Sequence, residues 1–589
     1  MKWVKTLLAA CVAAAGTLLM AEQMPDTFQE LRLQKDWKLF TGNPAISDAA
    51  PGAPYADTWQ LPDGKELKAR DLEIDEKGVD LNILLNERVP AGTPSVLVNS
   101  IESDSDKMAQ IGVGVDWWFV CYLNGEELYS TLNNGGNRVA VPGREDHVIN
   151  LPLKPGTNTL VLLTKGGSST RRIAVGAVPY RDITPCNPSL RNGPYLVNPI
   201  KGGGTVRFTS TGKMAGGIAI RKKGEEVFRN IWETKAGLLL RDQDLHSINL
   251  SGLEPGAEYE YKLLLQNTDN NGIVELPELY SFIVPGDESR PVSIFFSGDT
   301  QMMPEYLGEQ VEKLMKLPGA AEADYFFHAG DSSSTFNDTE NDTFKGLVDV
   351  ILKHTSHRPF YVPVRGNHEF FGKDASGYIR FFGTPDGKTY QAFSAGPCFV
   401  LALDSLAEEP DPFHEASYMC VMFDDYEAEE IAWLREVVKS EEFRNAPFRI
   451  VMTHAVPARN TTYKMTNVAD NLQKVLEDET DLAQPVHLWL GGHVHCYWRS
   501  IPGTSNFLAN RPTSTSNGWL PAENLLYTAL TCDGPNALGT ELSGTVLNVT
   551  PEEMEITSYT LDGEVMDHFK IYPDGSVEEL PVIKELIKH

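Results

Sequence analysis

The chain has 589 residues, and 51 lysines and arginines stand against 81 aspartates and glutamates, which gives a formal net charge of −30. Such a surface repels nucleic acid and anionic lipid, so a protein that tracks a nucleic-acid backbone is excluded. Any site for a phosphorylated ligand must carry its own positive charge, which bound metal would supply. The apolar content of 41% is that of an ordinary globular protein, and the length predicts about three or four domains.

The N-terminal residues have the pattern of a targeting segment. Two lysines precede the apolar stretch Leu7–Met20, which is too short for a comfortable membrane span. We therefore expect residues 1–21 to be a signal peptide and the protein to be secreted or periplasmic. The alternative is a lipid anchor at Cys11, because the residues around it resemble a bacterial lipoprotein box. No later stretch is apolar enough to predict a transmembrane span.

Residues 23–183 read as short alternating strands separated by glycine, asparagine and proline turns. The run Val113–Leu123 leads into Asn124-Gly125, which is a hairpin signal. The aromatic strand and its turn resemble galactose-binding-like jelly rolls that accompany secreted glycan enzymes, so we expect such a β-sandwich. Trp117 and Trp118 either stack on a carbohydrate or pack into the core.

Residues 185–286 form a second all-β segment. Thr205–Phe208 alternates between apolar and polar residues, and Leu253–Tyr259 resembles the corner of fibronectin type III-like sandwiches. We expect a sandwich of that kind. A linker rich in proline and charged residues, 284–291, ends it.

Residues 291–580 change pattern, because buried strands now alternate with amphipathic helices. Expected strands are Ser293–Phe296, Tyr325–His328, Phe360–Val362, Phe399–Leu403, Phe448–Met452 and His487–Leu490, and expected helices are Glu305–Leu317, Asp342–Leu352 and Tyr426–Val438. This alternation predicts a layered α/β domain of the αββα type, with its chemistry in loops beyond the strand ends. Gly544–Val549 and Met554–Tyr559 are expected to close the sheet.

Polar clusters occupy those loops. They are Gly298-Asp299-Thr300-Gln301, Gly330-Asp331, Gly366-Asn367-His368-Glu369, His454 and Gly492-His493-Val494-His495. Their carboxylate, amide and imidazole groups suffice for two divalent ions, which indicates metal-assisted hydrolysis of a phosphate ester. His493 and His495 are two residues apart, so in an extended segment both side chains point the same way. The neighbouring Cys496 is expected to be a small buried residue.

The order and spacing of these motifs resemble those of the calcineurin-like metallophosphoesterases. The last motif, Gly492-His493-Val494-His495-x-Tyr497-x-Arg499, and the preceding sandwich are similar to the purple acid phosphatase branch. The resemblance implies that Asp331 bridges two metal ions. Asp299 and His495 would bind the first, and Asn367, His454 and His493 the second. His368 would lie beside the leaving group, and a metal-bound hydroxide would attack the phosphorus in line.

Two positions depart from the family pattern. Purple acid phosphatases carry a tyrosine three residues after the second aspartate, where this chain has Ser334, and most other members carry a histidine at the position of Gln301. We expect the carbonyl oxygen of Gln301 to bind the first ion. A neutral amide holds a trivalent ion poorly, so the ions are expected to be divalent Mn, Zn or Fe, and the enzyme colourless.

Roles at the rim stay open. Glu369 either orients His368 or forms a plain salt bridge, and Arg459 either contacts substrate or is solvated. Tyr497 and Arg499 either line the pocket or pack beneath it. The loops 407–425 and 502–524 are expected to shape specificity.

The expected activity is hydrolysis of phosphomonoesters by a secreted dinuclear metallophosphoesterase. One alternative is a phosphodiesterase or nucleotidase of the same fold, because the motifs define the phosphoryl chemistry but not the second ester group. The other is a glycan-binding surface protein whose phosphatase activity is secondary.

Overall fold

The computed structural model describes residues 26–41, 57–60, 64–74, 77–87, 90, 92–132, 142–166, 171–181, 188–267, 272–301, 304–405, 422–460, 468–510, 519–521, 525–535, 542–582 and 586–588. They fall into two compact units, one ending at Arg181 and the other running from Pro188 onward, except that residues 267–272 group with the first. The expected signal peptide and Cys11 lie outside the described residues.

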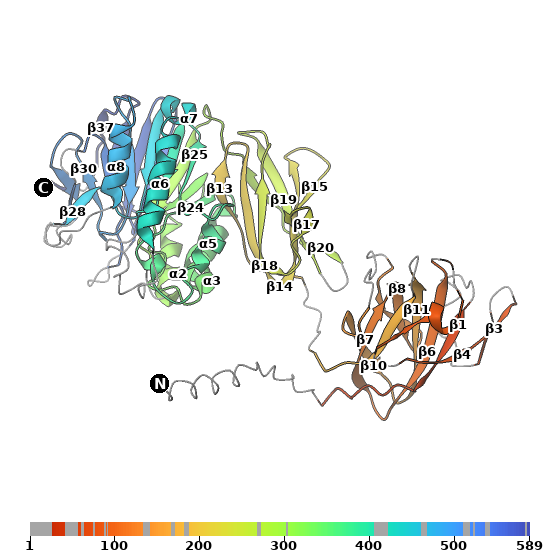
Figure 1. The fold of residues 1–589 in the computed structure, drawn as a ribbon. Coiled ribbons are helices and arrows are strands. Elements are labelled where there is room, and N and C mark those ends of the chain that lie inside the picture. The colour runs from red at the N-terminus through yellow and green to blue at the C-terminus, as the bar shows by residue number, and fades with distance from the viewer. Residues whose placement is uncertain are drawn as a thin grey trace, which may run out of the picture. The chain divides into compact units, whose positions relative to one another are not determined.

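The first unit is built from two β-sheets. One has the order β4-β1-β6-β11-β8-β9 and the other β10-β7-β12-β5 (Figure 1). The bounds are β1 Asp36–Thr41, β4 Arg70–Glu73, β6 Pro94–Ser103, β8 Trp117–Leu123, β9 Glu126–Ser130 and β11 Gly156–Gly166, then β5 Val79–Asp80, β7 Lys107–Val115, β10 His147–Leu153 and β12 Arg172–Ala177. A short hairpin, β2 Thr58–Gln60 with β3 Glu66–Lys68, and the helix α1 Leu81–Leu84 complete it. Leu39, Leu97, Ile111 and Ile173 pack in one core that draws on both sheets. The expected β-rich character of this region is confirmed.

The aromatic run of this unit is split between the two sheets. The chain leaves β7 at Val115 and enters β8 at Trp117, whose φ of 102° breaks the strand. Asn124 and Gly125 then turn the chain into β9 with φ of 50° and 92°, as expected for a tight hairpin. The two tryptophans Trp117 and Trp118 are half-buried and stacked on each other at 3.9 Å.

The second unit begins with strands that continue directly into its central sheet. The long strand β14 pairs with β13 and β18 through its first half, and with β15 and β19 through its second. β13 also pairs in parallel with β24, at Leu196 and Phe360. The bounds here are β13 Leu190–Ile200, β14 Gly203–Lys222, β15 Arg229–Trp232, β16 Thr234–Lys235, β17 Leu238–Leu239, β18 Gln243–Leu250, β19 Glu258–Gln266, β20 Ile273–Glu275 and β21 Tyr280–Ile283.

Two sheets form the body of this unit. The first contains β24 Phe360–Pro363, β23 Tyr325–His328, β22 Val292–Ser297, β34 Ser543–Val549, β35 Met554–Thr560, β36 Val565–Ile571 and β37 Val577–Glu579, in that order. The second contains β25 Gln391–Ala395, β26 Cys398–Ala402, β27 Phe448–Met452, β29 Leu488–Gly491, β33 Thr528–Thr531, β30 Trp498–Ser500, β31 Phe507–Ala509 and β38 Ile587–Lys588. β28 Ala458–Asn460 pairs with β32 Trp519–Pro521 outside these sheets. β34 pairs antiparallel with β22, so the C-terminal strands close the sheet as expected.

Three buried cores define a helix–sheet–sheet–helix order, because alternate residues of each strand face opposite sides. Phe296 and Val400 belong to the core that both sheets share. Phe326 packs with residues of α2 on the outside of the first sheet, and Trp489 packs with residues of α6 and α8 on the outside of the second (Figure 1). The helices are α2 Pro304–Leu314, α3 Thr339–Thr343, α4 Asp349–Thr355, α5 Gly377–Phe382, α6 Phe423–Val437, α7 Glu441–Asn445 and α8 Val468–Asp478. The expected α/β layering is confirmed.

The helix expected over Asp342–Leu352 is interrupted. α3 and α4 are separated by a wide helical turn, Phe344–Val348, in which Gly346 has a φ of 85°. A residue in this left-handed region cannot continue an α-helix, so one predicted helix becomes two short ones.

Two loops of the first sheet approach so closely that only glycine fits between them. A Cβ atom on Gly366 would lie 2.1 Å from Asp331 Oδ1 and 2.8 Å from the Asp331 amide nitrogen. The amide of Gly366 also donates to Glu369 Oε2 at 2.7 Å. Any side chain at this position would therefore push the loop after β24 away from the loop after β23.

We predict that Gly366→Ala destabilises the second unit by about 1–3 kcal/mol, the usual cost of overpacking a rigid site. The matched control is Gly308→Ala in α2, where the nearest atom to a new Cβ lies at 3.7 Å. That change should stabilise the helix by up to about 1 kcal/mol. Thermal unfolding of the full chain measures both. Equal melting temperatures for the two variants would contradict the prediction.

Candidate metal centre

The predicted site residues lie in five loops that follow the ends of β22, β23, β24, β27 and β29. β22, β23 and β24 run parallel to one another, and β27 and β29 are also parallel. The carboxyl ends of the strands in each sheet therefore lie at one edge, and there the polar clusters meet. Both sheets contribute to the same centre.

Four of the expected ligands occupy a strained backbone conformation. The φ angles are 50° at Asp299, 54° at Asp331, 73° at His493 and 52° at His495. Left-handed conformations are unfavourable for residues other than glycine, and they cluster at functional sites where the surrounding structure enforces them. The loops therefore hold these side chains in positions that a relaxed chain would not adopt.

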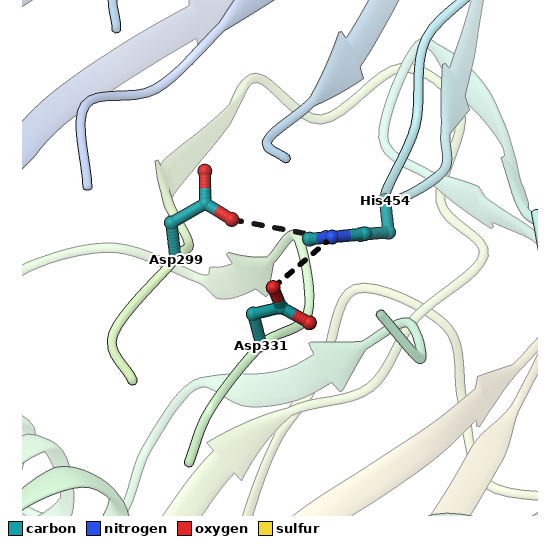
Figure 2. Close-up of side chains that lie close together, drawn as sticks. All are labelled: Asp299, Asp331 and His454. Atoms are coloured by element: carbon teal, nitrogen blue, oxygen red, sulfur yellow. Dashed lines mark ion pairs between the residues drawn. The ribbon is translucent and has the colours of Figure 1, made fainter. Parts of the chain in front are cut away.

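Asp299, Asp331 and His454 form the buried centre of the site (Figure 2). Each offers a ligand atom within 4.8 Å of the others, and none is more than 1% exposed. His454 Nε2 lies 3.3 Å from Asp331 Oδ2, and His454 Nδ1 lies 3.9 Å from Asp299 Oδ1. Two carboxylates and an imidazole at this spacing are a suitable donor set for a divalent ion.

Asn367 and His493 extend this centre on one side. Asn367 Oδ1 lies 3.1 Å from both His454 Nε2 and His493 Nδ1, and these two ring nitrogens are 3.2 Å apart. The other nitrogen of His454 faces the Ala329 carbonyl oxygen at 2.7 Å, to which it donates. In the neutral ring, His454 Nε2 then carries a lone pair, which faces the acceptor atoms Asn367 Oδ1 and Asp331 Oδ2. A cation between them would satisfy all of these atoms at once.

The electrostatics point in the same direction. Burial favours the neutral imidazole of His454, but the charges of Asp331 and Asp299 outweigh it and raise the pKa of His454 to about 10. Burial would likewise raise the pKa of Asp331, yet the neighbouring His454 holds it well below its usual value. The raised pKa of His454 shows that the two carboxylates create a negative field at the centre, which attracts a positive charge: a proton on His454 or, in its place, a metal ion.

Gln301 and His495 lie on the other side of Asp331. His495 Nδ1 donates to the Pro535 carbonyl oxygen at 2.6 Å, which leaves Nε2 as a lone pair. The Gln301 amide nitrogen donates to Asp331 Oδ2 at 3.0 Å and to His495 Nε2 at 2.8 Å. The buried Gln301 Oε1 has no hydrogen-bond partner. A half-turn of the amide would bring this oxygen to the position that a metal ligand requires.

The histidine pair is not extended, and that expectation is wrong. Both residues have left-handed φ angles, and the Val494 amide bonds back to the Gly492 carbonyl oxygen at 2.9 Å. This compact turn sends the two side chains to different neighbours. His493 contacts Asn367, whereas His495 contacts Gln301.

His368 lies at the accessible side of the centre. Its side chain is 27% exposed, and its Nε2 is 3.9 Å from Asp331 Oδ2. The Ser334 carbonyl oxygen accepts a bond from Nδ1 at 2.9 Å, which orients the ring. The backbone amide of His368 donates to Asp331 Oδ1 at 3.0 Å. This bond does not involve the His368 side chain, so it would remain if that side chain were replaced.

Glu369 has neither of the two roles expected for it. Its buried carboxylate accepts bonds from the amides of Asp331 at 2.9 Å, Ser332 at 2.9 Å and Gly366 at 2.7 Å, and from the Ser332 hydroxyl at 2.6 Å. Burial and the charge of Asp331 raise its pKa. Glu369 therefore ties two ligand loops together. The sequence signal was only its place beside His368.

His328 is a second supporting residue that the sequence did not reveal. It is fully buried at the end of β23, and burial lowers its pKa to about 3, so the ring is neutral. Its Nδ1 accepts from the Gly330 amide at 3.3 Å, and its Nε2 lies 3.1 Å from the Thr300 hydroxyl. The ring thus joins the Asp299 and Asp331 loops from below. A polar residue ending an apolar strand was the only signal.

The rim assignments separate into two groups. Arg499 is fully buried and bonds to Asp567 at 2.7 Å, and the Tyr497 hydroxyl bonds to the same carboxylate at 2.8 Å, so both pack beneath the site. Cys496 is buried, as expected. The Arg459 side chain lies outside the described residues, as do residues 407–421 of the first loop and residues 511–518 and 522–524 of the second.

Three comparisons relate the chain to known proteins. The family model of calcineurin-like phosphoesterases matches residues 292–497. Among curated proteins, none matches the chain significantly. Similar solved structures include a purple acid phosphatase, PPD1, from yellow lupin (Lupinus luteus), with 17% identity, coverage of 84% of this chain and 96% of that chain, and a TM-score of 0.46.

Two further structures are more distant. GAP50, the anchor in the inner membrane complex of Plasmodium, has 13% identity, coverage of 50% and 91%, and a TM-score of 0.30. The β-glucuronidase of Parabacteroides merdae has 12% identity, coverage of 80% and 62%, and a TM-score of 0.22. At TM-scores this low, none of these structures bears on the activity of this chain.

The matched range contains every one of the predicted site residues, from Asp299 to His495, and the loops that bring them together. The expected calcineurin-like domain is therefore confirmed. Residues 292–497 form a calcineurin-like phosphoesterase domain, which is the domain of a hydrolase of phosphate esters.

Proposed function

We propose that the chain is a secreted, dinuclear metallophosphoesterase of the purple acid phosphatase type that hydrolyses phosphomonoesters. The observation that carries this proposal is the gathering of lone-pair donors around Asp331. His454 Nε2, Asn367 Oδ1 and His493 Nδ1 lie within 3.2 Å of one another on one side. The unpartnered Gln301 Oε1 belongs to a second group on the other side.

The two groups suit two ions that share one carboxylate. Asp299, Gln301 and His495 would hold the first ion, Asn367, His454 and His493 the second, and Asp331 both. These ligands include only two carboxylates, so the set favours divalent Mn, Zn or Fe. When bound, the ions supply Lewis acidity for activating water and neutralising charge on the phosphoryl group.

His368 is the residue that we assign to the leaving group. Its bond to the Ser334 carbonyl oxygen places the proton on Nδ1 in the neutral ring, and a protonated ring would donate from Nε2. This nitrogen faces the accessible side of Asp331. It can protonate a departing alkoxide or donate to a phosphoryl oxygen.

The remaining parts of the chain complete the proposal. Residues 1–21 would direct secretion, with a lipid anchor at Cys11 as the alternative. Residues 23–183 would be a galactose-binding-like module, residues 185–286 a fibronectin type III-like sandwich, and residues 291–580 the catalytic domain. The half-buried aromatic pair of β8 supports carbohydrate as a partner of the first module. No helix in the described part of the chain is long and apolar enough to cross a bilayer.

The first prediction from this proposed function concerns the substrate class and the bridging residue. With added Mn²⁺ or Zn²⁺, we expect p-nitrophenyl phosphate to be hydrolysed faster than bis(p-nitrophenyl) phosphate. Asp331→Ala should reduce kcat below about a tenth of the wild-type value, because it removes the ligand that both ions share. The exposed Asp242→Ala is the control and should be fully active.

Preferred turnover of the diester would support the phosphodiesterase alternative. If neither ester is hydrolysed and the protein binds polysaccharide, the glycan-binding alternative is supported. An Asp331→Ala variant with more than about a tenth of the wild-type rate would contradict the bridging assignment.

The second prediction separates two roles of His368. His368→Ala should slow turnover roughly 10²–10⁴-fold without loss of metal, because the backbone amide still bonds to Asp331. If His368 protonates the leaving group, the variant should lose more activity toward alkyl phosphates than toward p-nitrophenyl phosphate, because the p-nitrophenolate leaving group needs little protonation. His354→Ala, in an ion pair on α4, is the control. Loss of bound metal from the His368→Ala variant would contradict the assignment.

The third prediction concerns the first ion. Ser334 stands where purple acid phosphatases carry their tyrosine, and its hydroxyl donates to the backbone carbonyl oxygen of Gln301 at 3.2 Å. Protein reconstituted with iron should therefore lack a strong visible charge-transfer band. Ser334→Tyr should gain one, whereas Ser333→Tyr, one residue away, should not. A strong band in the wild-type protein would contradict the proposal.

A further inference from the structure

A buried ion pair lies behind the loop that carries Asn367 and His368. Arg365, two residues after the end of β24, donates from Nε and Nη2 to Asp404 Oδ2, both at 2.6 Å. The Asp404 side chain is fully buried, and that of Arg365 is 12% exposed. Asp404 follows β26 of the second sheet. The pair therefore joins a ligand loop of one sheet to a strand end of the other.

The charges around this pair balance. Asp404 Oδ2 also accepts from the Thr389 hydroxyl at 2.6 Å, and Glu430 Oε1 accepts from the Asp404 amide at 2.8 Å. Burial, and then the charge of Asp404, raise the pKa of Glu430 well above its usual value, which favours its neutral form. In the ion pair itself, one guanidinium faces one carboxylate. The pair is well bonded, which is the condition under which buried charges are tolerated.

Aromatic rings hold the guanidinium in its orientation. The Arg365 head lies 4.7 Å from the centre of the Phe370 ring and 5.5 Å from that of Tyr426. Phe370 belongs to the same loop, two residues after His368, and Tyr426 lies on α6. Cation–π contacts therefore attach both ends of the ligand loop to one planar group.

The same strand end reaches a second ligand loop. The Ser405 hydroxyl, next to Asp404, accepts from the Ala455 amide at 3.0 Å. Ala455 directly follows His454. Asp404 thus bonds to Arg365, two residues before Asn367, and Ser405 bonds to Ala455, which follows His454. The atoms Asn367 Oδ1 and His454 Nε2 lie 3.1 Å apart.

We infer that Arg365 and Asp404 are positioning residues for the second metal ion. They set the position of the Asn367 loop relative to the His454 loop, so that both ligands meet one ion. This inference rests on the proposed function, because it assumes that two ions bind. Residues that orient metal ligands typically contribute 10–100-fold to metal affinity or activity.

The test is Asp404→Asn in the full chain, because asparagine keeps the shape of the side chain and removes its charge. The matched control is Asp324→Asn. Asp324 pairs with Arg290 at 2.9 Å, before the start of β23 and far along the strand from the site. Both variants lose a partly or fully buried carboxylate that bonds to an arginine, but only one touches a ligand loop.

Metal uptake is the main measurement. Chelator-treated protein is titrated with Mn²⁺ in a calorimeter, and wild type should take up two ions. For Asp404→Asn we expect one of the two ions to bind about 10–100-fold more weakly, whereas Asp324→Asn should bind both as wild type does. Excess Mn²⁺ should restore much of the lost kcat of Asp404→Asn. A purely structural role would lower the melting temperature without changing either readout.

Thr389→Val provides a milder variant if Asp404→Asn does not fold. It removes one neutral donor to Asp404 and leaves the ion pair, so the same ion should bind more weakly by a smaller factor, about threefold or more. Wild-type Mn²⁺ affinity in whichever of these variants folds would overturn the inference while leaving the proposed function intact. A wild-type protein that takes up fewer than two ions would instead contradict the proposed function, and the inference with it.

Discussion

The catalytic unit depends on one unfavourable arrangement, in which buried lone-pair atoms face one another at hydrogen-bond distance. Asp331 Oδ2 and the ring nitrogens and amide oxygen around it are separated by 3.1–3.3 Å. In the neutral form of His454 these electron-rich atoms repel at such distances, and burial removes the water that would otherwise separate them. A proton on His454, which its raised pKa favours, relieves part of this repulsion, and a metal ion would relieve all of it. Until it binds, the rest of the unit must hold the atoms together.

The fold supplies that restraint in three ways. Left-handed backbone at four expected ligands fixes their direction at a cost on the order of 1–3 kcal/mol each. Glu369 collects amides from two loops into one carboxylate. The absence of a side chain at Gly366 lets those loops touch. Each of these restraints is local, but all of them depend on the continuous core that the two sheets share. If the sheets could move apart, the loops at their ends would also separate.

This division explains what the sequence could and could not predict. Strands such as Tyr325–His328 can be predicted because they are short apolar runs in the sequence. The candidate ligands can be predicted because polar residues recur, in a characteristic order, where those runs end. The turn at His493–His495 differs from the extended segment that the spacing predicts, because a long-range contact replaces the local default: the His493 amide bonds to Asp299 Oδ1 at 2.9 Å, and both histidines have left-handed φ angles. Folding brings Glu369 to the Asp331 and Ser332 amides and His328 to the Thr300 hydroxyl, and such contacts leave no periodic pattern in the sequence.

The proposed charge of the site would also explain how an acidic protein binds an acidic substrate. The chain carries a net charge of −30, but physiological salt screens this charge beyond about 8–10 Å, so a phosphate ester is repelled mainly at shorter distances. Close to the site, two carboxylates with the two divalent ions of the proposed function would leave two positive charges uncompensated, which would match a phosphate dianion. Ser334 would preserve this excess, because it adds no negative charge at the position where purple acid phosphatases carry a tyrosine. Under that proposal, substrate would be selected on contact, among groups at the accessible side such as His368, rather than by long-range attraction.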